Sequence, residues 1–109
     1  MRIWDLNPCR LCRNHLLGEH RELHAVWSIL TRHKKGYSRH PETLRWKGKL
    51  RALFLRHEAL VKEMDKRHYA HRSPLPPRLA TGRNKQDILL ASSHQQIHIL
   101  RLKKCDCDV

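Results

Sequence analysis

The sequence predicts an all-α fold: a compact single domain over residues 1–109, with three main helices, an irregular N-terminal lead and a Pro-rich, basic linker before the last helix. Two long segments repeat apolar residues at spacings of three and four, the pattern of an amphipathic helix. The chain has 4 Gly and 5 Pro, which leaves room for uninterrupted helices. A chain of 109 residues is long enough for one modest core and not for two.

The first helix is expected over residues 13–35, after an irregular lead over residues 1–12. Its apolar residues follow spacings of seven, four and three: Leu16, Leu23, Trp27 and Leu30. Trp27 is therefore expected in the core. Gly36 is the expected stop, because the two lysines before it suit the last turn, where the helix dipole favours cations.

A short helix is expected over residues 42–47, interrupted at Gly48, because Pro41 suits a first helical position. The clearest apolar pattern follows over residues 49–70 and steps by three and four: Leu50, Leu53, Phe54, His57, Leu60, Val61, Met64 and His68. His57 and His68 are therefore expected to be buried with hydrogen-bond partners. The Pro-rich segment ends this helix.

The linker is expected to run over the surface to residue 84. A last, less regular helix is expected over residues 86–104, where Ser92 and Ser93 can break it.

The charge balance points to a polyanionic partner. Lys and Arg number 23 against 10 Asp and Glu, a net charge of +13. Nucleic acid is the first candidate, because neutralised phosphates release counterions; a membrane surface and an acidic protein are weaker candidates. No segment approaches the roughly 18 apolar residues of a membrane span, and the start lacks the apolar run of a secretory signal. We expect a monomer in the cytoplasm, associated with the nucleoid, that binds double-stranded DNA.

The basic residues expected to contact DNA lie in the lead, on the first helix and in two later stretches: Arg2, Arg10, Arg13, Arg21, and residues 32–39 and 45–51. Trp4, Tyr37 and Trp46 are candidates to stack on exposed bases.

Four cysteines form a CxxC near the start and a CxC near the end: Cys9, Cys12, Cys105 and Cys107. In a reducing compartment they are expected to be thiols or metal ligands and not disulfides. A zinc ion held by all four would join the termini. The CxC spacing is short for zinc, so plain thiols are the default and no cofactor is expected. The ten histidines form no zinc pattern, and His20 and His24 carry little weight.

One side of the first helix carries polar residues separated by small ones: Asn14, His15, Gly18, Arg21, Glu22 and Ala25. A hollow with a few convergent polar groups is suited to a substrate. From periodicity alone, a solvated face with a lattice of ion pairs is the preferred interpretation.

A resemblance shifts that balance. Residues 15–23 read HLLGEHREL, and the chain starts Met-Arg-Ile. Both features resemble the phage-type pyrimidine-dimer DNA glycosylases, in which a similar H-L-x-x-E-x-R-E-L run opens the first long helix. Residues 63–75 resemble the corresponding helix end in short bacterial relatives. The likeness covers about residues 1–75, and the C-terminal third departs from the phage enzyme.

The resemblance implies a DNA repair glycosylase with abasic-site (β-elimination) lyase activity on pyrimidine dimers or related damaged bases. The nucleophile would be the N-terminal α-amine, which the register places on Met1; the bulky Arg2 should block removal of that methionine. Glu22 matches the catalytic carboxylate. Four residues match family positions that contact DNA or support the site, Asn14 through a related amide: Arg2, Asn14, His15 and Arg21. No metal is required, and no lysine lies on the Glu22 face of the first helix.

Two other interpretations stay open. The basic helices could form a non-catalytic DNA-binding module, or the cysteines could staple an interaction domain through zinc. The lesion is open as well: pyrimidine dimers, oxidised pyrimidines and abasic sites all remain candidates.

Overall fold

The described residues, 2–70, 73–103 and 105–109 of a computed structural model, form helices and no β-strand. Their elements in chain order are the 3-10 turn η1 (Pro8–Arg10), α1 (Arg13–Arg32), α2 (Pro41–Arg45), α3 (Leu50–Lys66), the 3-10 turn η2 (Pro77–Leu79) and α4 (Ser93–Leu102). The predicted all-α class with three main helices, α1, α3 and α4, is confirmed. No helix in these ranges is long and apolar enough to cross a membrane.

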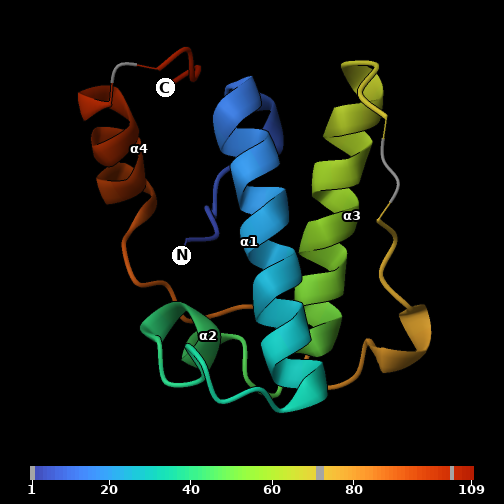
Figure 1. Ribbon diagram of the computed structural model, residues 1–109. Helices are drawn as coiled ribbons and strands as arrows, with labels where there is room; N and C mark the ends of the chain where they lie inside the picture. Colours follow the sequence, from blue (N-terminus) through green and yellow to red (C-terminus); the bar gives the residue numbers. More distant parts are fainter. Residues whose placement is uncertain (1, 71–72, 104) are drawn as a thin grey trace.

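Helices α1 and α3 pack side by side in opposite directions (Figure 1). Their predicted apolar faces meet, and Leu16, Leu23, Leu53 and Leu60 are completely buried between them. Trp27 is buried as expected, with its ring 6.5 Å from that of Phe54. The interface between α1 and α3 forms the larger part of the core.

The N-terminal lead is irregular, as predicted, and its apolar side chains are buried. Figure 1 shows it between α1 and α4, and Ile3, Trp4, Leu6 and Leu11 belong to the core. The proposed stacking role of Trp4 is therefore wrong: the indole is 5% exposed. The large apolar area of a tryptophan is most stabilising where it leaves water completely.

Trp46, the second aromatic residue expected to stack on bases, is also buried, with 2% of its surface exposed. Its indole Nε1 donates a hydrogen bond of 3.0 Å to Glu42 Oε1. A buried indole needs such an acceptor. Tyr37 is 71% exposed and stays a candidate.

Helices α1 and α3 end earlier than predicted, because a residue after each helix adopts a left-handed conformation. His33 (φ 52°) follows α1, and the next amide bonds back to the Ile29 carbonyl. His68 (φ 62°) follows α3, and the amide of Tyr69 bonds back to Met64. These bonds satisfy the last carbonyls as a Schellman motif does. His68 is exposed, so its predicted burial is wrong.

The last helix begins later than predicted. Ser92 and Gln95 form a capping box, each side chain bonding the backbone N–H of the other. Residues 86–91 are not helical, and the predicted break at Ser92 is the actual start. The linker also stabilises the start of α3, because the carbonyls of Thr81 and Arg83 accept the first amides of that helix, from Arg51 and Ala52.

Candidate active site

A buried ion pair between α1 and α3 holds the start of the chain. Both oxygens of Glu19 accept from Arg56, with Nε–Oε2 at 2.7 Å and Nη2–Oε1 at 2.9 Å. Glu19 Oε1 also accepts the backbone N–H of Trp4 at 3.0 Å, and Arg56 Nη1 donates to the Leu6 carbonyl at 2.8 Å. Burial raises the pKa of Glu19, against the opposing influence of Arg56 and the Trp4 N–H. Our sequence analysis did not single out Glu19, although it lies inside the HLLGEHREL run.

Two more side chains fix the same segment from the other helices. Arg45 of α2 donates to the Ile3 carbonyl at 2.9 Å and contacts the Asp5 carboxylate at 3.1 Å. Gln96 of α4 accepts the Asp5 N–H at 2.8 Å. All four helices thus hold residues 3–6. Met1, the expected nucleophile, lies outside the described residues.

A cleft of about 300 Å³ opens beside this anchored segment. Its walls come from the lead, α1 and the end of α4: Arg2, Trp4, Asn14, His15, Gly18, Glu19, Glu22, Ile99 and Lys103. Gly18 leaves a hollow in the helix face, as predicted, whereas Ala25 is outside the lining. Four of the expected site residues share this cleft: Arg2, Asn14, His15 and Glu22.

Arg21 lies beside the cleft and not in its lining. Its side chain is exposed, and Nη2 would be 3.9 Å from a Cβ placed on Gly18. The guanidinium therefore lies over Gly18, in reach of a polyanion at the cleft mouth.

The cleft contains a charge that the α1 pattern did not reveal. Lys103, at the end of α4, lines the cleft, although no lysine lies on the Glu22 face of the first helix. Burial, together with the charge of Lys103, lowers the pKa of His15. The His15 ring packs edge-on against Trp4, at 5.9 Å between centroids, and Arg2 lies over Trp4 at 4.9 Å.

The sequence profile described as pyrimidine dimer DNA glycosylase matches residues 1–76. The chain belongs to this family. The match includes α1, α2 and α3 and the part of the cleft built by the lead and α1, but not Ile99 or Lys103. Comparison with curated proteins and with solved structures gave no match. The family is one of DNA glycosylases, so DNA is its substrate.

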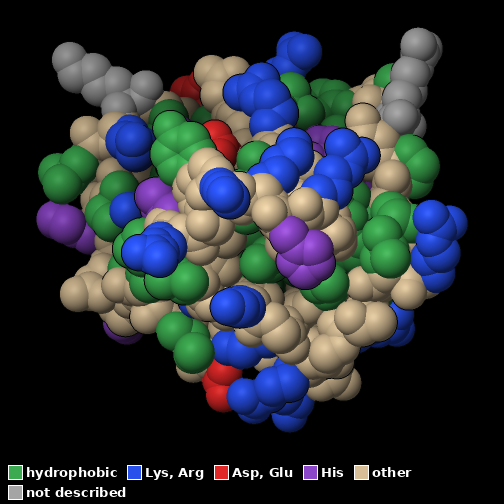
Figure 2. Space-filling view, turned by 60° about the horizontal axis from the view of Figure 1, so that its bottom comes forward, with side chains coloured by type: hydrophobic (Ala, Val, Ile, Leu, Met, Phe, Trp, Pro, Cys, Tyr) green, Lys and Arg blue, Asp and Glu red, His purple; other side chains and the backbone are tan. Residues whose placement is uncertain are grey.

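The end of the molecule formed by the last turn of α1, α2 and the start of α3 carries a basic surface. Figure 2 shows Lys and Arg side chains spread over this face, with few acidic side chains among them. Its exposed basic residues include Arg32, Lys34, Lys35, Arg39, Lys47 and Arg51. Arg32 is ten residues from Glu22 along α1, a rise of about 15 Å.

Two basic residues of the 45–51 stretch are not available to DNA. Arg45 and Lys49 are each 4% exposed. Arg45 holds the lead, and Lys49 Nζ bonds Gln86 at 2.7 Å and Asp87 at 3.0 Å. Their expected contact with DNA is corrected, because buried cations need the acceptors that surround them here.

Three of the four cysteines come together, but with a histidine in place of the fourth. Cys12, Cys105 and Cys107 gather with His15, whereas Cys9 is exposed and stands apart. Burial raises the pKa of the Cys107 thiol to about 12. Burial also opposes ionisation of Cys12, but hydrogen bonds, first from the His15 backbone, lower its pKa overall.

A second histidine group crosses from α1 to α3. His20, His24 and His57 place ring nitrogens within 4.8 Å of one another. His24 Nε2 lies 3.2 Å from His57 Nε2, and His57 Nδ1 lies 3.0 Å from Glu58 Oε1. The predicted burial of His57 with partners is confirmed. The sequence analysis missed this group, because its third member comes from another helix.

Proposed function

We propose that this protein excises damaged pyrimidines from double-stranded DNA and then cuts the strand at the resulting abasic site. The proposed lesion is the pyrimidine dimer, because the family is described as one of pyrimidine dimer DNA glycosylases. The single observation that carries the proposal is the shared cleft: Arg2, Asn14, His15 and Glu22, matched one by one to family positions, line the same hollow. A solvated lattice of ion pairs would not require a cleft at these residues.

The proposed nucleophile is the α-amine of Met1. Its lone pair attacks C1′ of the damaged nucleotide, and the glycosidic electron pair leaves with the base, which takes up a proton. The amine then loses a proton, the sugar ring opens, and C1′ and nitrogen form an imine. An α-amine suits this chemistry because it is more readily deprotonated than a lysine side chain at neutral pH.

Glu22 is the proposed proton carrier. A carboxylate in the cleft can take the proton that the amine releases, pass it to the sugar oxygen during ring opening, and accept the acidified C2′ proton afterwards. Loss of the C2′ proton expels the 3′ phosphate and breaks the strand. Arg2, Arg21 and Asn14 are proposed to bind the phosphates and sugar around the lesion.

Borohydride trapping on abasic-site DNA tests the imine. We expect a covalent protein–DNA adduct whose modified peptide contains Met1, linked through its α-amine. A variant with one glycine added before Met1 should form no adduct, because the amine moves out of register with Glu22. An intact mass that retains Met1 is a precondition for this assignment.

Lys103 is the rival nucleophile that the structure introduces, and Lys103→Arg is the matched control. The side chain of Lys103 lines the cleft and is exposed. If Met1 supplies the amine, Lys103→Arg should trap as well as the parent protein. An adduct on Lys103, or one that survives the added glycine, would refute the amine assignment. DNA binding without any adduct or cleavage would favour a non-catalytic module.

DNA affinity should depend steeply on salt. Each phosphate neutralised contributes a slope of about 0.9 in a plot of log K against log salt. Six contacts would weaken binding about a thousandfold between about 50 and 200 mM salt. Fluorescence anisotropy with undamaged and abasic duplexes measures both slopes. The pair Lys34→Gln/Lys35→Gln should lower the slope by about 0.9 per lysine that contacts a phosphate; a flat salt dependence contradicts phosphate contact.

A further inference from the structure

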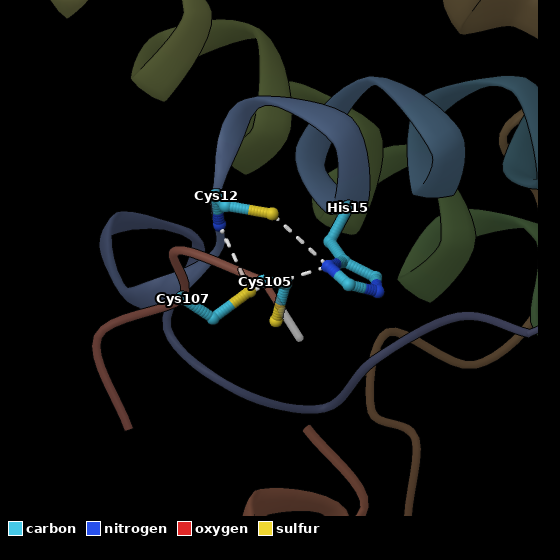
Figure 3. A group of neighbouring side chains, drawn as sticks. All are labelled: Cys12, His15, Cys105 and Cys107. Atoms are coloured by element: carbon cyan, nitrogen blue, oxygen red, sulfur yellow. Dashed lines mark hydrogen bonds between the residues drawn. The ribbon is translucent and has the colours of Figure 1, made fainter. Parts of the chain in front are cut away.

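The C-terminal tail returns to the start of α1 and brings two thiols to the thiol and the imidazole that lie there (Figure 3). Cys12 is the N-cap of α1, and His15 follows one helical turn later. Cys105 and Cys107 come from the tail after α4. The four ligand atoms all lie within 4.8 Å of one another. Residues from the two ends of the chain thus form one donor set of the Cys3His type.

The geometry suits a single tetrahedral ion. With Zn–S near 2.3 Å and Zn–N near 2.0 Å, ligand atoms around zinc lie roughly 3.5–3.8 Å apart. His15 Nδ1 lies 3.0 Å from Cys12 Sγ and 3.3 Å from Cys107 Sγ. Small rotations of the side chains would open the space for the ion. An iron–sulfur cubane, with each ligand on a different iron, needs its ligand atoms farther apart.

The tail is positioned by bonds that do not involve the thiols. The Asp108 N–H donates to the Arg10 carbonyl at 2.7 Å, and Arg10 Nε donates to the Asp108 carbonyl at 2.9 Å. The Cys12 N–H points at Cys107 Sγ, 3.0 Å away. A backbone N–H directed at a ligand sulfur helps to fix the orientation of that ligand. These bonds hold the ligand atoms of the tail close to Cys12 and His15 before any ion binds.

We propose that Cys12, His15, Cys105 and Cys107 bind one zinc ion, which fastens the C-terminal tail to the N-terminal end of α1. Three thiolates and an imidazole are soft and borderline ligands that select zinc over magnesium or calcium. Four protein ligands close the tetrahedron, so the ion is structural. Three thiolates leave the complex with one negative charge, and the cationic residues Arg10 and Arg13 are among those that line the same hollow.

The ion would also orient a residue of the Glu22 cleft. With Nδ1 on zinc, the proton of His15 is held on Nε2, which becomes a fixed hydrogen-bond donor. The His15 ring lines the cleft as well as the metal group. His15 is then a positioning residue, and the ion takes no part in the reaction.

Metal analysis of the purified, reduced full chain tests this assignment without any activity measurement. The protein is produced in cells grown with added zinc and purified by gel filtration. We expect about one zinc ion per chain by inductively coupled plasma mass spectrometry. Cys107→Ser and His15→Asn should lose the ion. Cys9→Ser is the matched control and should keep it, because Cys9 is exposed and outside the group. Circular dichroism checks that each variant keeps its helices.

Cobalt(II) gives a second readout on the parent chain alone, which keeps the test valid if a variant does not fold. The parent chain loaded with Co²⁺ in place of zinc should show the visible bands of tetrahedral Co²⁺ and the charge-transfer absorption of cobalt–thiolate bonds. Metal-free chains with full helicity, equal loss of metal in Cys9→Ser and Cys107→Ser, or octahedral cobalt spectra would each overturn the proposal. A chain without metal whose mass lacks two hydrogens would instead indicate a disulfide and refute it.

Discussion

Glu22→Gln is expected to abolish strand cleavage at abasic sites and leave DNA affinity almost unchanged. Glutamine has nearly the same shape and can form hydrogen bonds, but it cannot accept or deliver the protons that ring opening and elimination require. Loss of a general acid–base group costs about 10²–10⁴-fold in rate. Single-turnover cleavage and anisotropy on the same abasic duplex measure the two effects separately.

Asp65→Asn is the matched control, since it neutralises an exposed carboxylate on α3 instead of one in the cleft. The control should cleave at the parent rate. Parent-like cleavage by Glu22→Gln would exclude Glu22 as the proton carrier. Reduced affinity without reduced cleavage would assign it to DNA binding instead.

Glu19→Ala is expected to be the most destabilising single change considered, by about 3–5 kcal/mol. It leaves the guanidinium of Arg56, only 15% exposed, without its partner, and it removes the acceptor of the buried Trp4 N–H. The anchored lead should loosen, so imine trapping should fall together with stability. Urea unfolding followed by circular dichroism gives the free energy of unfolding.

Replacing both Glu19 and Arg56 separates two effects on stability: the loss of the ion pair, and the burial of one charge without its partner. Glu19→Met/Arg56→Met should be more stable than Glu19→Ala, because no buried charge remains without a counter-ion. Asp65→Ala, a surface control, should stay within about 0.5 kcal/mol of the parent chain. A small effect of Glu19→Ala would mean that the buried pair does not hold the lead.

Several features follow from neighbours in the sequence alone. Apolar residues at spacings of three and four place the core faces of α1 and α3, because side chains one helical turn apart share a face. The same spacing puts Asn14, Gly18 and Glu22 on one side of α1, where the cleft lies. The helix ends were less predictable, since left-handed His33 and His68 carry no strong local signal.

Only the tertiary structure decided which polar and aromatic residues are buried. Arg45 can be buried because the Ile3 carbonyl, 42 positions away, accepts a hydrogen bond from its guanidinium. Trp4 can be buried because Glu19 accepts a hydrogen bond from its backbone N–H. Lys103 reaches the cleft, and Cys107 reaches His15, through the return of the chain after α4. Local periodicity determines a face, whereas burial of a charge or assembly of a ligand set depends on partners distant in sequence.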